Sequence, residues 1–294
     1  MPITPAPSDS APQRTMPDVQ ASKDARNVAI DKVGVKNIRY PISLLCPRTG
    51  GRQHTVARVN MYVGLPHHQK GTHMSRFLEV LNKHHLELAS DQIMDVCHDM
   101  RERLESEEAH LELSFPYFIP KRAPVTGESG LLDIEVLFKA KADRRRERDD
   151  FILGVKVPAT SLCPCSKEIS RYGAHNQRCE MEVQVRFTPG RFMWIEDLFD
   201  LVESCASTQV FAVLKRPDEK YVTEAAYDNP KFVEDIVRDL ALALDAEERV
   251  AWYQVMSENF ESIHNHNAYA FIERDKAPHA TASGANAAAA LDPR

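Results

Sequence analysis

Two cysteines and a histidine are the most reactive side chains of the segment "TSLCPCSKEISRYGAHNQR", residues 160–178. Cys163 and His175 supply a thiolate and an imidazole, the donors that zinc and related metals prefer. A proline separates Cys163 from Cys165 and constrains the backbone, so both thiols need not reach one metal. A redox disulfide between them is disfavoured because so short a loop strains the bond. Alone, the segment is equally consistent with a metal site and with two buried thiols that do no chemistry.

A second group of reactive side chains lies in "SENFESIHNHNAYAF", residues 257–271, between two strand-like runs. If the chain is extended from Ser262, His264 and His266 project to the same face. A single histidine is usually a surface or hydrogen-bonded residue, but two histidines beside Glu258 and Glu261 favour a functional site. Added to the first segment, they provide enough donors for one metal with an open coordination position.

A third group is the turn "LPHHQKGTHMSR", residues 65–76, which precedes a predicted helix. A glycine-containing turn with free N–H groups at a helix start, flanked by cations, can bind phosphate. The cationic side chains of this turn are Lys70, His73 and Arg76. The turn does not match the phosphate loop of P-loop enzymes. A polar loop that ends in an ordinary cap at Ser75 explains the same residues equally well.

Glu234 lies near the start of the helix predicted in "NPKFVEDIVRD". The helix dipole favours a carboxylate at this position, which is a sufficient structural explanation. A carboxylate held there can also accept two N–H bonds from the amidine edge of a guanine-like ring.

The elements that must position these groups follow from hydrophobic periodicity, which alternates in strands and repeats every three to four residues in helices. In the first half it predicts strands at 36–45 and 54–65, helices at 75–88 and 90–109, and strands at 110–119 and 131–142. In the second half it predicts strands at 150–159 and 180–187, helices at 194–206 and 230–244, and strands at 249–259 and 266–274. Residues 141–150 and 209–229 are predicted to be linkers.

The predicted order β-β-α-α-β-β therefore occurs twice, once in residues 28–145 and once in residues 146–275. Consecutive strands favour antiparallel pairing with helices on one face, an α+β architecture. The ends of the chain, residues 1–27 and 276–294, are poor in large apolar side chains and are predicted to be disordered.

Composition narrows the classes of function. The chain has 294 residues, a net charge of −6 and 43% apolar residues, typical of a soluble globular protein that is not a nucleic-acid coat. No apolar run approaches the ~20 residues that span a bilayer. The N-terminus lacks the features of a signal peptide, and 6 cysteines in so long a chain indicate reduced thiols in the cytoplasm.

Several motifs in one order make the sequence recognisable: "VGVKNIRYPI", "LPHHQKGTHMSRF", "SFPYF", "TSLCPCSKEISRYGAHNQR", "LKRPDEKYVTE", "NPKFVEDIVRD" and "ENFESIHNHNAYA". Together they resemble GTP cyclohydrolase of the IB type over roughly residues 33–274. The resemblance implies tandem tunnelling-fold (T-fold) modules, each β-β-α-α-β-β with an antiparallel sheet and helices on one face. It also implies a homotetramer with active sites at the subunit interfaces.

The reaction implied by the resemblance opens the imidazole ring of GTP with water. It releases C8 as formate and forms 7,8-dihydroneopterin triphosphate, the first step towards tetrahydrofolate. One divalent metal per site, Zn²⁺, Mn²⁺ or Fe²⁺, is expected to lower the pKa of water, and a histidine to move protons.

Roles are transferred from the family motif by motif. The implied metal ligands are Cys163, His175, Glu219 and His264. Cys163 is also expected to be catalytic, with Glu261 and His266 as acid/base or supporting groups. Glu234 resembles the carboxylate that anchors the purine. Charge and placement suggest that Lys70, His73, Arg76, Lys167 and Arg178 bind the triphosphate.

Two other functions use the same residues. Another T-fold enzyme that acts on a purine or pterin, such as a nitrile reductase, would use its cysteine as a covalent nucleophile, with a nicotinamide cofactor and no metal. A non-catalytic purine- or metal-binding module would use the groups structurally.

Overall fold

The computed structural model describes residues 18–20, 22–84, 87–88, 90–145 and 149–276. Its first half contains β1 (Ile30–Cys46), β2 (Gly51–Leu65), α1 (Met74–His84), β3 (Glu87–Leu88), α2 (Ser90–Arg103), β4 (Glu108–Arg122) and β5 (Ser129–Asp143). Apart from the short strand β3, this is the predicted order of elements.

The second half contains β6 (Asp150–Leu162), α3 (Pro164–Ile169), β7 (Asn176–Phe187), α4 (Ile195–Glu203), β8 (Thr208–Gln209), α5 (Arg216–Asp228), α6 (Val233–Ala246), β9 (Val250–Asn259) and β10 (Ala268–Asp275). The four long strands and the helices α4 and α6 were predicted. The prediction of a linker over 209–229 was wrong, because this segment contains α5. That helix buries only Asp218 and Ala226, so it has no apolar stripe to mark it.

The strands form one 10-stranded sheet in the order β10-β9-β7-β6-β5-β4-β2-β1-β3, and β8 pairs with β6. β5 and β6 join the two halves as antiparallel neighbours, from Glu135 opposite Lys156 to Lys141 opposite Asp150. Among the described strands, all neighbouring pairs are antiparallel except β3 with β1, which form a short parallel pair. The two halves therefore share a continuous sheet, as a tandem of antiparallel modules requires.

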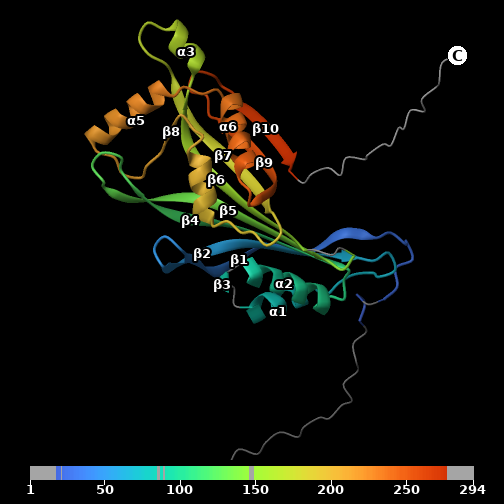
Figure 1. Ribbon diagram of the computed structural model, residues 1–294. Coiled ribbons are helices and arrows are strands. Elements are labelled where there is room, and N and C mark those ends of the chain that lie inside the picture. Colours follow the sequence, from blue (N-terminus) through green and yellow to red (C-terminus); the bar gives the residue numbers. More distant parts are fainter. Residues whose placement is uncertain (1–17, 21, 85–86, 89, 146–148, 277–294) are drawn as a thin grey trace, which may run out of the picture.

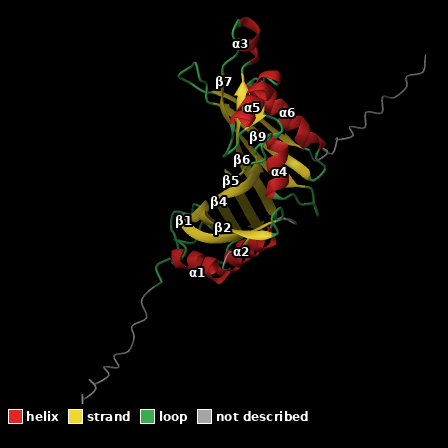
Figure 2. Cartoon of the chain, turned by 90° about the vertical axis from the view of Figure 1, so that its left-hand side faces the viewer, coloured by secondary structure: helices red, strands yellow, loops and turns green. Residues whose placement is uncertain are grey.

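Helices and sheet bury one hydrophobic core that runs through both halves. Helices α1 and α2 pack on the strands of the first half, while α4 and α6 pack on those of the second (Figures 1 and 2). Along β4, the buried side chains of Leu111, Leu113 and Phe115 alternate with more exposed ones. Because alternate residues of a strand point to opposite faces, the charged side chains lie on the face away from the helices.

The N-terminal residues 18–20 and 22–27 lie against the β2–α1 loop. Lys23 forms a β-bridge with Gln69, and Gly71 donates its N–H to the Gln20 carbonyl at 3.1 Å. The prediction of disorder was therefore wrong for these residues, since backbone pairing holds them without apolar burial. The rest of the predicted tails, residues 1–17 and 277–294, lie outside the described residues.

Within the described ranges, no helix is both long enough and apolar enough to cross a membrane.

Candidate functional site

Cys163 lies at the turn where β6 ends and α3 begins. Its N–H donates to the carbonyl of His175 at 3.1 Å, so the backbone holds these two predicted ligands side by side. The thiol is half-buried, and its sulfur accepts the N–H of Ser166 at 3.4 Å as the cap of α3. Pro164 begins the helix, where a missing N–H costs nothing. Cys165, by contrast, is exposed.

His175 is held by a chain of side chains that the sequence analysis missed. Its Nδ1 lies 2.9 Å from the Gln177 amide oxygen, and the Gln177 amide nitrogen donates to the Ser161 hydroxyl at 2.7 Å. Both partners are buried. An imidazole whose Nδ1 is fixed in this way presents Nε2 to a ligand, as metal-binding histidines do. Because the predicted strand began only at residue 180, the sequence did not mark Gln177 as an inward side chain of β7.

The β9–β10 loop, residues 260–267, comes next to His175. The Phe260 N–H donates to the Arg178 carbonyl at 2.9 Å, and the Ser262 hydroxyl lies 3.4 Å from His175 Nδ1. The loop is bent, so the condition of an extended chain from Ser262 is not met, and the strand predicted at 266–274 begins at Ala268. The sequence therefore correctly placed residues 160–178 and 257–271 in one group, but it did not predict the bend of the β9–β10 loop.

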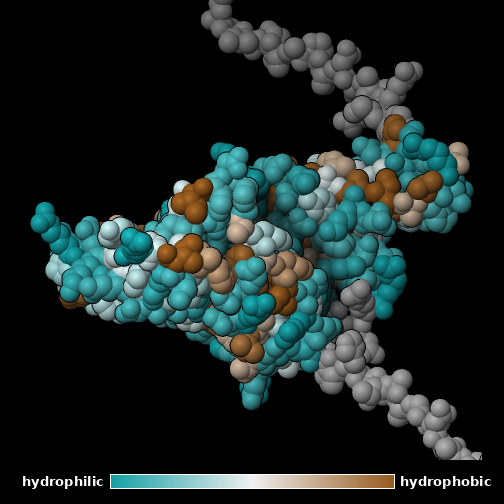
Figure 3. Space-filling view, turned by 90° about the horizontal axis from the view of Figure 1, so that it is seen from above, coloured by the Kyte–Doolittle hydropathy of each residue, from teal (hydrophilic) through white to brown (hydrophobic). Residues whose placement is uncertain are grey.

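Within this loop the two predicted histidines are nonetheless parallel. The rings of His264 and His266 stack with centroids 5.0 Å apart and an interplanar angle of 15°. Both are exposed, whereas Glu261 is half-buried. The isoleucines Ile169 of α3 and Ile263 of the loop are also exposed, and this end of the molecule shows separate hydrophobic patches on a mostly hydrophilic surface (Figure 3).

The predicted carboxylates Glu219 and Glu234 lie on helices that follow each other in the chain, α5 and α6. Glu234 is exposed in the first turn of α6, and Lys231 just before it donates its N–H to the Leu162 carbonyl at 3.0 Å, beside Cys163. Glu219 is exposed in the first turn of α5.

Lys167, predicted to bind the triphosphate, connects α3 to α5 in this chain. Its ammonium donates to the Tyr227 carbonyl and lies 4.3 Å from the Tyr227 ring centroid. It would have to leave these contacts to bind phosphate.

The proposed metal donors are only partly assembled in one chain. Among the described residues, no three His, Cys, Asp or Glu side chains converge into a metal site. The donors still suit a divalent metal, because a half-buried thiol lies beside an imidazole whose Nδ1 is fixed by Gln177. Cys163, His175 and the loop that carries His264 are brought together, while Glu219 is not.

The β2–α1 loop with Lys70 and His73, and Arg76 in the first turn of α1, are far from these groups, since α1 and α3 lie at opposite ends of the molecule (Figures 1 and 2). The N–H groups of Lys70 and Gly71 donate to backbone carbonyls of the N-terminal segment at 3.0 and 3.1 Å. The prediction that these amides are free to bind phosphate was therefore wrong. The side chains are also engaged: His73 Nε2 lies 3.0 Å from an Asp18 oxygen, and Arg76 donates to a backbone carbonyl of α2 at 3.3 Å.

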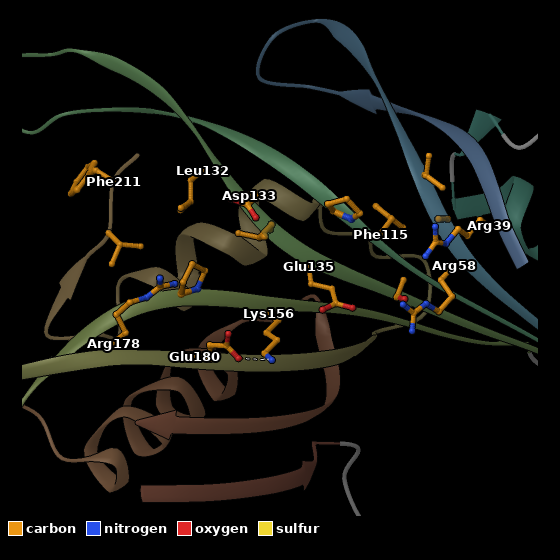
Figure 4. A pocket seen from close by; sticks show the side chains of 17 residues that line it. Arg39, Arg58, Phe115, Leu132, Asp133, Glu135, Lys156, Arg178, Glu180 and Phe211 are labelled. Carbon is orange, nitrogen blue, oxygen red and sulfur yellow. Dashed lines mark ion pairs between the residues drawn. The ribbon is translucent and has the colours of Figure 1, made fainter. Parts of the chain in front are cut away.

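Arg178 lies on β7 and lines a cavity of about 900 Å³ on the sheet face away from the helices (Figure 4). Arg39 and Arg58 lie at the other end of the cavity and face each other across β1 and β2. Lys156 and Glu180 form an ion pair on its floor. Arg178 is thus separated from the cations of the β2–α1 loop.

Comparison with known proteins identifies the family. Residues 16–270 match the family model described as "Type I GTP cyclohydrolase folE2". The chain belongs to this family. It is 56% identical over 261 residues to GTP cyclohydrolase FolE2 of Geobacter sulfurreducens, with 89% of this chain and 99% of the relative covered. The relative from Magnetococcus marinus is 57% identical over 261 residues, with 89% and 97% covered.

Solved structures show the fold alone. The uricase from Bacillus fastidious matches with a TM-score of 0.52 at 9% identity, over 90% of this chain and 99% of that one. The uricase from Arthrobacter globiformis matches with a TM-score of 0.50 at 6% identity, over 90% and 96%. With the antiparallel sheet and its helices, this likeness confirms the α+β tunnelling fold that the sequence motifs implied for this FolE2 family member.

Proposed function

We propose that the protein is a metal-dependent GTP cyclohydrolase that converts GTP and water into formate and 7,8-dihydroneopterin triphosphate. This reaction is the first step of tetrahydrofolate and pterin biosynthesis. Membership of the FolE2 family over residues 16–270 is the observation that carries the proposal. In the structure, Cys163, His175 and the β9–β10 loop lie next to one another, which also supports the proposal.

Cys163, His175, His264 and Glu219 would hold one divalent metal, Zn²⁺, Mn²⁺ or Fe²⁺. A metal bound there supplies Lewis acidity that makes water a better nucleophile near neutral pH. Gln177 fixes the His175 ring through Nδ1, which would leave Nε2 to bind the metal. The described residues form no complete metal site in one chain, as expected for a site that is completed between copies.

The other residues bind the substrate and move protons. Glu234 would accept N–H bonds from the guanine edge, favoured by its place in the first turn of α6. His266, stacked on His264, and the half-buried Glu261 would exchange protons with the opening ring. Both lie in the exposed β9–β10 loop, where a substrate can reach them.

A site at the interface between copies is supported by the separation of the two predicted groups. The metal donors lie at the α3 end, and Lys70, His73 and Arg76 lie at the α1 end (Figure 1). One chain cannot place both on one GTP, whereas a second copy can bring its α1 end to the first. β10 forms one end of the strand order and exposes Tyr269 and Phe271. Such an edge favours assembly, and we propose a homotetramer.

The proposed enzyme acts in the cytoplasm on a small molecule, and binds neither nucleic acid nor a membrane. The net charge of −6 supports the first of these exclusions.

Metal removal tests the proposal. Chelator-stripped protein is expected to release no formate from GTP, and one of Zn²⁺, Mn²⁺ or Fe²⁺ is expected to restore the activity. A control preparation that is handled in the same way without chelator should retain its activity. Formate release that survives complete removal of the metal would contradict the proposed mechanism.

A further inference from the structure

The segment that leads into α5 rests on the tip of the β4–β5 hairpin, which belongs to the other half of the chain (Figure 1). Lys121 on β4 donates to the Val210 carbonyl at 2.9 Å. At the start of β5, a Cβ added to Gly130 would lie 3.1 Å from the Ala212 side chain and 3.3 Å from that of Val213. The two segments therefore touch closely before α5 begins.

Asp218, in the first turn of α5, makes the strongest contact with the hairpin. It is fully buried. Its Oδ1 accepts the N–H groups of Val125 and Thr126 at 2.8 and 2.9 Å. Its Oδ2 accepts the Thr126 hydroxyl at 2.7 Å and the Lys215 N–H at 2.9 Å. Both carboxylate oxygens are thus satisfied by protein donors.

Three of these donors come from the hairpin and one from the residue just before α5. A buried carboxylate whose lone pairs are filled by donors from two segments fixes their relative position.

The first turn of α5 has no apolar anchor in the core. The buried residues of the helix are Asp218 and Ala226, so no apolar stripe anchors its first turn. The residue that follows Asp218 is Glu219, which is exposed. The position of Glu219 therefore depends on a polar contact with the hairpin rather than on core packing.

We propose that Asp218 is a positioning residue for the metal site: by tying the first turn of α5 to the hairpin at Val125 and Thr126, it fixes the position of Glu219, the proposed ligand that lies apart from Cys163 and His175 in one chain. The inference rests on the proposed function, in which Glu219 is a ligand. It assigns a role to the β4–β5 hairpin, which contributes none of the proposed ligands.

The test uses Thr126→Val, which removes one hydroxyl donor to Asp218 and keeps the shape of the side chain. The full-length, chelator-stripped protein is titrated with Zn²⁺ against a chromophoric chelator. Loss of an indirect support is expected to weaken Zn²⁺ binding about tenfold. Thr126→Ser keeps the hydroxyl and should bind Zn²⁺ like the wild type.

Thr188→Val is the matched control, because the Thr188 hydroxyl donates to the Glu248 carbonyl at 2.9 Å on an exposed surface away from α5. It loses one hydrogen bond of the same kind and should leave Zn²⁺ affinity unchanged. Amide hydrogen exchange gives a second readout: Thr126→Val should speed exchange at Lys215, while Thr188→Val should not.

Glu219→Gln separates this proposal from the function on which it rests. If Glu219→Gln weakens Zn²⁺ binding but Thr126→Val and Asp218→Asn bind it like the wild type, the positioning role is refuted and the ligand assignment stands. If Glu219→Gln itself binds Zn²⁺ normally, the ligand assignment fails and the positioning role fails with it. Weaker binding in all three variants, with normal binding in Thr126→Ser, supports the proposal.

Discussion

Replacement of Lys121 by methionine is expected to destabilise the protein by about 3–5 kcal/mol, because it leaves a buried carboxylate without its counter-charge. Lys121 on β4 and Glu203 at the end of α4 form an ion pair whose side chains are only 8% and 5% exposed. The ammonium also donates to the Val210 carbonyl at 2.9 Å and lies 4.2 Å from the Phe211 ring centroid. The pair joins the two halves of the chain, so its loss affects the whole fold.

The pH dependence of this variant follows from the buried glutamate. Burial raises the pKa of Glu203, and Lys121 opposes that rise. Without Lys121, the folded state binds a proton at Glu203 at a higher pH than the unfolded state does. Stability of the variant is therefore lost as pH rises through the folded pKa, and its deficit relative to wild type should shrink from pH 8 to pH 5.

Urea unfolding at several pH values, followed by circular dichroism, measures both effects. The matched control is the double variant Lys121→Met/Glu203→Leu, in which an apolar pair of similar volume packs beside Phe199 and Phe211. It should recover to within about 1 kcal/mol of wild type, because well-packed apolar residues replace buried ion pairs without loss. A single variant that loses less than about 1 kcal/mol, or a double variant as unstable as the single one, would refute this reasoning.

Three further outcomes are expected. Cys163→Ala should abolish formate release while the protein stays folded, and Cys165→Ala, which changes an exposed thiol, should remain active; equal activity in both would exclude Cys163 from the chemistry. Glu234→Gln should raise the KM for GTP about 10- to 100-fold with an unchanged circular dichroism spectrum, since a charged acceptor for the guanine N–H groups is lost; an unchanged KM would exclude this anchor. Gly34→Ala should destabilise the protein by about 3 kcal/mol or more in urea unfolding, because its Cβ would collide with a backbone carbonyl of β2. Gly127→Ala, with φ 73° and open space around it, should cost about 1 kcal/mol, and similar losses in the two alanine variants would contradict the packing described for β1.

The sequence predicted the strands well because burial on one sheet face imposes alternation, as in β4 with Leu111, Leu113 and Phe115 inward. It did not predict α5, because a helix that buries only Asp218 and Ala226 carries no apolar period. Backbone pairing such as the Lys23–Gln69 bridge also leaves no mark in side-chain pattern. Hydrophobic periodicity therefore revealed the elements that pack in the core. It did not reveal α5 and the N-terminal segment, which polar and backbone contacts hold in place.

The candidate site shows the same division. Residue chemistry led to Cys163, His175 and the histidine loop, which the fold brings together. The support of His175 by Gln177 and Ser161 depends on distances between strands that no spacing encodes. The amides of the β2–α1 loop looked free in the sequence because their acceptors come from the distant N-terminal segment.

Incubation of the chelator-stripped protein with GTP labelled at C8 and a single divalent metal tests the central claim most directly. The proposed function predicts that the label leaves as formate and that an equal amount of pterin, fluorescent after oxidation, is formed with at least one of Zn²⁺, Mn²⁺ or Fe²⁺. Cys163→Ala under the same conditions should give neither product. Label that stays in the purine with every metal, in a folded wild-type protein, would contradict the account.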